Sequence, residues 1–156
     1  MTAALKCPAV IIEQTLQALR EAGAHGTERV VLLLSHRPVS PGNPIVQMYI
    51  PQQEVAVDYF RIPPEGMQAM MAHLRANKLA LVTQVHSHPA EAFHSQADNT
   101  WAITRHAGAL SLVVPYFAAA TTTGNFAEKI AAFRLSPSDE WLEIRRADLS
   151  RYFEIT

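Results

Sequence analysis

Two histidines in the middle of the chain form the first pattern that could do chemistry. His86 and His88 lie two residues apart and directly follow an apolar run from Leu79 to Val85. Because side chains alternate between the two faces of a strand, residues two apart point the same way. Both imidazoles are therefore predicted to share one face, where they could bind a single metal ion without distorting the backbone.

A carboxylate downstream could complete a set of metal ligands. Ser95 and Asp98 are three residues apart at the expected start of a helix, which places them on neighbouring turns of one surface. If that helix packs its N-terminus against the end of the histidine strand, Asp98 is the third ligand. Two histidines and one carboxylate leave one tetrahedral position of a zinc ion for water, as in catalytic rather than structural zinc sites. A general base must then lie within hydrogen-bonding reach of that water.

Each part of this pattern also has an ordinary explanation. Ser95 and Asp98 before an apolar stretch resemble a helix capping box, with Asp in place of the usual Glu or Gln. The two histidines could lie at the exit of a strand without any function, and Glu28 could be a solvated residue ahead of another strand. Chance rarely brings all three features together, so the combination favours a metal site.

The elements that must position these residues alternate between helices and strands. Interleaving of this kind predicts an α/β fold in which a mixed sheet is flanked by helices. The whole of 1–156 is predicted to be a single domain, with a catalytic core at about 10–116 and closing strands within 126–156. Apolar spacing predicts helices at 10–22, 64–77 and about 95–106, and strands at 29–35, 45–50, 55–62, 79–85, 109–116, 130–135, 141–145 and 152–155.

Composition narrows the classes of function. The chain has 156 residues, of which 49% are hydrophobic and 17% charged, an ordinary balance for a globular domain with one core. A formal net charge of -1 with scattered basic residues argues against a nucleic-acid partner. Cys7 is the single cysteine, which rules out an internal disulfide or a cysteine zinc site and suggests a cytoplasmic protein. No apolar window reaches the roughly 20 residues that span a bilayer, so no membrane association is expected.

The motif residues resemble those of a known family. His86-Ser87-His88-Pro89, followed by Ser95 and Asp98, is similar to the JAMM motif of the MPN+ (or JAB) zinc metallopeptidases. That family also carries a Glu beside its first core strand, the position that Glu28 occupies here. The order of elements from about Val10 to Tyr116 is similar too, which implies a JAB/MPN fold with cytidine-deaminase-like layers. One departure is that nine residues separate His88 from Asp98, where the family pattern has ten.

The resemblance implies specific roles and partners. His86, His88 and Asp98 would bind one zinc ion per chain. Glu28 would deprotonate the attacking water and later protonate the leaving amine, and Ser95 would steady the oxyanion or the water. JAMM enzymes commonly cleave after the C-terminal Gly-Gly of ubiquitin or a ubiquitin-like protein, alone or in conjugates. The compact bacterial members are the most similar, and some of them act with E1- and E2-like proteins in antiviral conjugation systems.

Three other functions stay open at this stage. A related peptidase could trim the Gly-Gly end of a sulfur-carrier protein by the same chemistry. A metal-free MPN-type scaffold would bind partners and catalyse nothing, although such relatives typically lack ligands that this chain retains. A zinc hydrolase of small amides is a third alternative, but the chain lacks the His-x-Glu and Pro-Cys-x-x-Cys signatures of nucleobase deaminases.

Overall fold

A six-stranded sheet runs through the centre of the protein in the order β3-β2-β6-β7-β8-β9. The computed structural model describes residues 3–93, 103 and 106–156. The central strand β6 pairs with β2 in antiparallel fashion and with β7 in parallel fashion, so the sheet is mixed, as predicted. The six strands are β2 (Val30–His36), β3 (Ile45–Tyr49), β6 (Leu79–Ser87), β7 (Leu110–Val114), β8 (Ala131–Leu135) and β9 (Trp141–Ile144).

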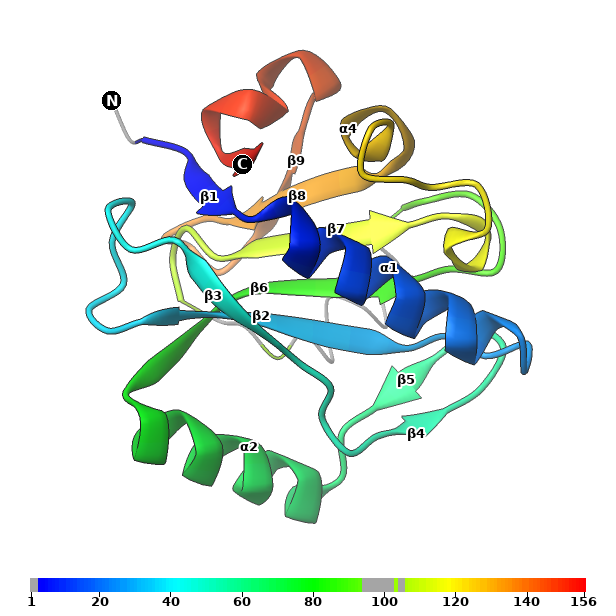
Figure 1. Ribbon diagram of the computed structural model, residues 1–156, viewed down its shortest axis with the longest axis horizontal. Helices are drawn as coiled ribbons and strands as arrows, with labels where there is room; N and C mark the ends of the chain where they lie inside the picture. Colours follow the sequence, from blue (N-terminus) through cyan, green and yellow to red (C-terminus); the bar gives the residue numbers. More distant parts are fainter. Residues whose placement is uncertain (1–2, 94–102, 104–105) are drawn as a thin grey trace.

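Two helices cover the sheet and confirm the predicted layers. Helix α1 (Ala9–Gly23) crosses one face, and α2 (Pro64–Asn77) lies on the side of the other face, below the sheet in the view of Figure 1. Strand β2 is buried along almost its whole length because alternate side chains enter two separate cores. Val31 and Leu33 join the core under α1, whereas Val30 and Leu32 join the core that includes α2. This two-sided burial explains the continuous apolar run in the sequence.

A bulge in β6 decides which residues face α2. Leu33 pairs with Thr83 and Leu34 pairs with Leu81, so Val82 is an extra residue between the two pairs. Leu81 packs against the core on the α2 side, while Val82 belongs to the core under α1. Because of the extra residue, odd-numbered residues at the start of β6, such as Leu81, face the same side of the sheet as even-numbered residues at its end, such as His86.

The first and last strands of the chain pair with each other. β1 (Leu5–Cys7) runs parallel to β10 (Phe153–Ile155), and Figure 1 shows the two ends close together. The sequence predicted a strand near β10 but none near β1. The short helices around them, also not predicted, are η1 (Tyr116–Ala118), α4 (Phe126–Lys129) and η2 (Arg146–Arg151).

The predicted strand at 55–62 is wrong in its extent. The segment is a hairpin of two very short strands, β4 (Glu54–Val55) and β5 (Phe60–Arg61). Its turn is closed by a hydrogen bond from the Ala56 N–H to the Tyr59 carbonyl, 2.9 Å long. The imperfect alternation of polar and apolar residues in this stretch reflects the turn. The predicted helix at 95–106 falls almost entirely outside the described residues.

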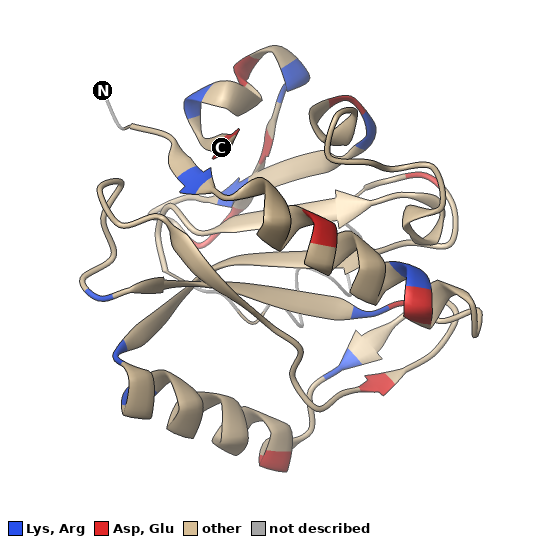
Figure 2. Ribbon diagram, viewed as in Figure 1, with Lys and Arg blue, Asp and Glu red and all other residues tan. Residues whose placement is uncertain are grey.

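Charged residues of both signs are interspersed along the described ribbon in Figure 2. Among the described helices, none is both long enough and apolar enough to cross a membrane.

Candidate metal centre

The two motif histidines lie side by side at the end of β6. His86 is fully buried and His88 is 4% exposed. Their Nε2 atoms face each other at 3.2 Å. Two ligands bound to one tetrahedral zinc ion at about 2.05 Å would be separated by roughly 3.3 Å. The pair therefore fits a shared metal ion. The same distance also allows a hydrogen bond in which one ring donates and the other accepts.

A backbone carbonyl orients the His88 ring. The Nδ1 atom of His88 lies 3.3 Å from the Glu91 carbonyl oxygen, which can only accept a hydrogen bond. His88 therefore donates through Nδ1, and its Nε2 atom carries the lone pair that a metal ion requires. The His88 ring also makes a T-shaped contact with Phe93, with ring centroids 4.7 Å apart, and Phe60 packs against His86 at 5.2 Å. The histidine pair thus has an aromatic neighbour on each ring.

Glu28 lies just before β2, at the same end of the sheet as the histidines. Val30 pairs with His86, and the Ser87 N–H donates to the Arg29 carbonyl at 3.2 Å. The same register, continued by one residue, sets Glu28 opposite His88. In this register the side chains of Glu28, His86 and His88 belong to the same face. Glu28 is buried, with only 3% of its surface exposed.

The β4–β5 hairpin holds the backbone around Glu28. The Glu28 N–H donates to the Ala56 carbonyl at 2.8 Å. The Gln53 side chain makes the two backbone hydrogen bonds that a neighbouring strand would make with Val30. It accepts from the Val30 N–H at 2.8 Å and donates to the Val30 carbonyl at 3.0 Å. Sequence reasoning missed Gln53, because a glutamine in the connection Pro51-Gln52-Gln53 carries no signal of this role.

A second buried glutamine lies two residues before His86. Gln84 is fully buried and donates to the Ser111 hydroxyl at 3.1 Å. Its Oε1 atom accepts a hydrogen bond from the backbone N–H of Ile103 at 2.9 Å. Ile103 in turn packs against the core on the α2 side. Gln84 thereby ties the chain after the Ser95–Asp98 segment to the same strand that carries the histidines.

A left-handed turn follows β7 and contacts the histidine loop. Tyr116, Phe117 and Ala118 have φ angles of 53°, 52° and 63°, a conformation in which non-glycine side chains crowd the backbone. The cost is about 1–2 kcal/mol for each residue. Strain of this size persists only where surrounding contacts hold the backbone in place, and such positions often occur at functional sites.

The other two predicted site residues, Ser95 and Asp98, lie outside the described residues. Within 3–93, 103 and 106–156, no group of three or more His, Cys, Asp or Glu side chains is placed to hold a metal ion. The structure therefore brings together His86 and His88, puts Glu28 at the same sheet end, and leaves the predicted third ligand as a prediction.

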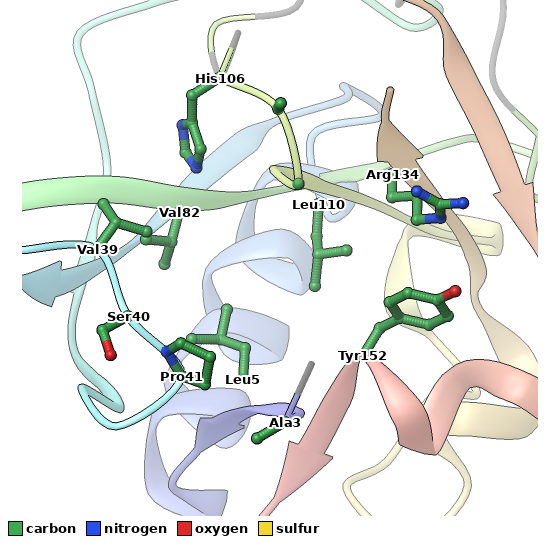
Figure 3. Close-up of a pocket in the computed structure, with 12 residues that line it drawn as sticks. Ala3, Leu5, Val39, Ser40, Pro41, Val82, His106, Leu110, Arg134 and Tyr152 are labelled. Atoms are coloured by element: carbon green, nitrogen blue, oxygen red, sulfur yellow. The ribbon is translucent and has the colours of Figure 1, made fainter. Parts of the chain in front are cut away.

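A separate cavity lies toward the opposite end of the sheet. It encloses about 270 Å³ and is lined largely by apolar side chains, among them Leu5, Val82 and Leu110, with His106 at its margin (Figure 3). Burial lowers the pKa of His106, which favours its neutral form. Val82 and Leu110 belong to the early parts of β6 and β7, so this cavity is distinct from the histidine pair.

The chain is similar to a curated protein named as a probable metalloprotease, y4jG of Sinorhizobium fredii (strain NBRC 101917 / NGR234). The two are 39% identical over 95 residues, which cover 61% of this chain and 57% of that protein. The match is thus to little more than half of the relative's length. No protein-family model matches the chain. The metalloprotease relative and the paired histidines support the resemblance to the JAMM/MPN family.

Two solved structures share the fold of this chain at low sequence identity. Protein DSY2949 from Desulfitobacterium hafniense aligns with a TM-score of 0.67 and 18% identity, covering 97% of this chain and 92% of its own. A protein from Salinibacter ruber (strain DSM 13855) aligns with a TM-score of 0.57 and 19% identity, covering 90% and 89%. These two comparisons establish a shared fold and nothing about activity.

Proposed function

We propose that this chain is a zinc metallopeptidase of the JAMM type. The observation that carries the proposal is the pair of facing Nε2 atoms, 3.2 Å apart, with the His88 Nδ1 atom turned to the Glu91 carbonyl. Metal-binding histidines characteristically donate their second ring N–H to such a carbonyl. The metalloprotease relative supports a metal cofactor, and His86, His88 and Asp98 would hold it.

Each residue then has a defined task. When bound, zinc would supply Lewis acidity for the scissile carbonyl and for the attacking water. The Glu28 carboxylate would accept a proton from that water and pass it to the nitrogen of the leaving amine. Ser95 would donate a hydrogen bond to the oxyanion that develops on the carbonyl. The burial of Glu28 supports its role, because a shielded carboxylate exchanges protons with substrate rather than with bulk solvent.

The proposed substrate is the C-terminal Gly-Gly tail of a ubiquitin-like protein, joined to a lysine or to a following peptide. His86, His88 and Glu28 are each less than 5% exposed, so a scissile bond must come very close to the backbone to reach them. Glycine residues allow this close contact because they have no Cβ atom. E1- and E2-like proteins are proposed partners only if the tail is indeed conjugated.

Zinc content tests the metal site directly. Wild type, His88→Ala and His73→Ala are purified free of metal, loaded with zinc under identical conditions and measured by elemental analysis. His73 is a matched control because it lies on α2, away from the histidine pair, and its ring bonds to the Gln47 side chain of β3. Wild type and His73→Ala should hold about one zinc per chain, and His88→Ala much less. Equal zinc in all three proteins would refute the proposed site.

A second assay separates the candidate substrates. The zinc-loaded enzyme is given a ubiquitin-like protein fused through Gly-Gly to a peptide, the same protein linked to a lysine, and an Ala-Ala control tail. Cleavage of both Gly-Gly substrates with the control left intact is expected. Cleavage of the fusion alone would favour the trimming of a carrier protein. A protein that holds zinc but cleaves none of the three would favour the zinc hydrolase of small amides, whereas a protein that holds no zinc would match the metal-free scaffold.

A further inference from the structure

The backbone of His88 is held on both sides by the last residue of β7 and by the turn that follows β7. The His88 N–H donates to the Val114 carbonyl at 2.9 Å, and the His88 carbonyl accepts from the Phe117 N–H at 2.9 Å. A third hydrogen bond, from the Tyr116 N–H to the Ala90 carbonyl at 3.0 Å, ties the next part of the same loop. The position of this histidine therefore depends on the left-handed turn at 116–118.

That turn is held in place by one side chain from α1. The Nε atom of Arg20 donates to the Ala118 carbonyl at 3.0 Å, and its Nη2 atom donates to the Thr121 carbonyl at 2.5 Å. These contacts bridge parts of the chain about a hundred residues apart. Three residues further on, Gly23 allows α1 to approach so closely that a Cβ atom there would collide with the Cβ of Phe117.

We propose that Arg20 is a positioning residue for the metal ligand His88. It fixes one carbonyl of the strained turn and a second carbonyl three residues after it, and the turn presents the Phe117 N–H to the His88 carbonyl. Loss of the guanidinium would let the turn relax toward ordinary backbone angles and would carry the His88 backbone with it. Residues that orient a metal ligand typically change metal affinity by ten- to a hundredfold when they are altered. This inference rests on the proposed metal site.

The test compares Arg20→Met with Arg37→Met. Arg37 is a matched control, because its Nε atom also donates to a backbone carbonyl, that of Leu79, but at the opposite end of β6. Zinc affinity is measured by competition with a chromophoric chelator, at a temperature where circular dichroism finds each metal-free variant folded. Arg20→Met should bind zinc about ten- to a hundredfold more weakly than wild type, and Arg37→Met should match wild type. In the metal-free protein, the Phe117 amide should exchange faster in Arg20→Met alone.

The outcomes separate this inference from the proposed function. Wild-type protein that takes up no zinc would overturn both. Zinc affinity that is equal in wild type and Arg20→Met, however much stability the substitution costs, would overturn the inference alone. If Arg20→Met does not fold, Arg20→Lys takes its place, since a single ammonium cannot reproduce the two directed bonds. A lysine variant that folds and keeps full zinc affinity would equally refute the role of Arg20.

Discussion

At the scale of single residues, the proposed site divides between two groups that would bind the metal and one that would move protons. His86 and His88 are defined by their facing Nε2 atoms, whereas Glu28 is defined by its place two residues before Val30, the residue that pairs with His86. These roles predict different consequences of substitution, because loss of a ligand removes the metal while loss of a base leaves it bound.

Glu28→Gln should separate binding from catalysis. The amide has the shape of the carboxylate but cannot accept a proton, so kcat on a Gly-Gly substrate should fall by about 10²–10⁴-fold. Zinc content should stay near that of wild type. Steady-state kinetics and elemental analysis of the same preparation check both halves. Wild-type kcat in this variant would remove Glu28 from the mechanism, and loss of zinc would make it a ligand instead.

At the scale of elements, the turn at 116–118 departs most from what its residues prefer. Tyr116 is 53% exposed and has a φ of 53°. Asn tolerates this region better than Tyr, so Tyr116→Asn should raise the free energy of unfolding by about 1 kcal/mol relative to a control. The control is Tyr59→Asn, since Tyr59 is 46% exposed and its φ is not positive. Urea unfolding measures both. A larger loss of stability for Tyr116→Asn than for Tyr59→Asn would contradict the account of strain.

The helices, strands and turns differ in how well the sequence predicted them. Strict alternation predicted that His86 and His88 share a face, and continuous apolar runs predicted the buried strands, because both are local properties. The turn at 116–118 escaped prediction, since Tyr-Phe-Ala contains neither Gly nor Asn. Its conformation comes from long-range contacts such as those of Arg20. The β4–β5 hairpin was missed for a similar reason, as backbone contacts with Glu28 and Val30, which are distant in the sequence, hold this segment.

At the scale of the whole molecule, the pairing of β1 with β10 buries the single cysteine. Cys7 has no exposed surface, and burial raises the pKa of its thiol from 9.0 to about 12. The sequence offered no sign of this pairing, because three residues at one end meet three residues at the other. Two strands so short gain their order only from the core that they close.

Stability should therefore fall at alkaline pH in a way that depends on Cys7. Above pH 9 the unfolded chain loses the thiol proton while the folded chain keeps it, so the free energy of unfolding decreases as pH rises. From pH 8 to pH 10 the loss should be about 1.4 kcal/mol greater in wild type than in Cys7→Ala. Urea unfolding under reducing conditions at the two pH values measures the difference. Equal losses in both proteins would show that the thiol does not titrate on unfolding.

The parallel pairing of β6 with β7 has a consequence for the order in which the protein folds. Residues 88–109 must return from the end of β6 to the start of β7, and such a crossover closes only when both strands have met. The backbone partners of His88 come from Val114 and Phe117, which lie beyond that crossover. A nascent chain ending before β7 would carry both histidines but neither of the backbone hydrogen bonds that Val114 and Phe117 make with His88. At the proposed metal site, the final position of the His88 backbone is thus reached late in folding, with the long-range closure of the sheet rather than with the strand that bears the histidines.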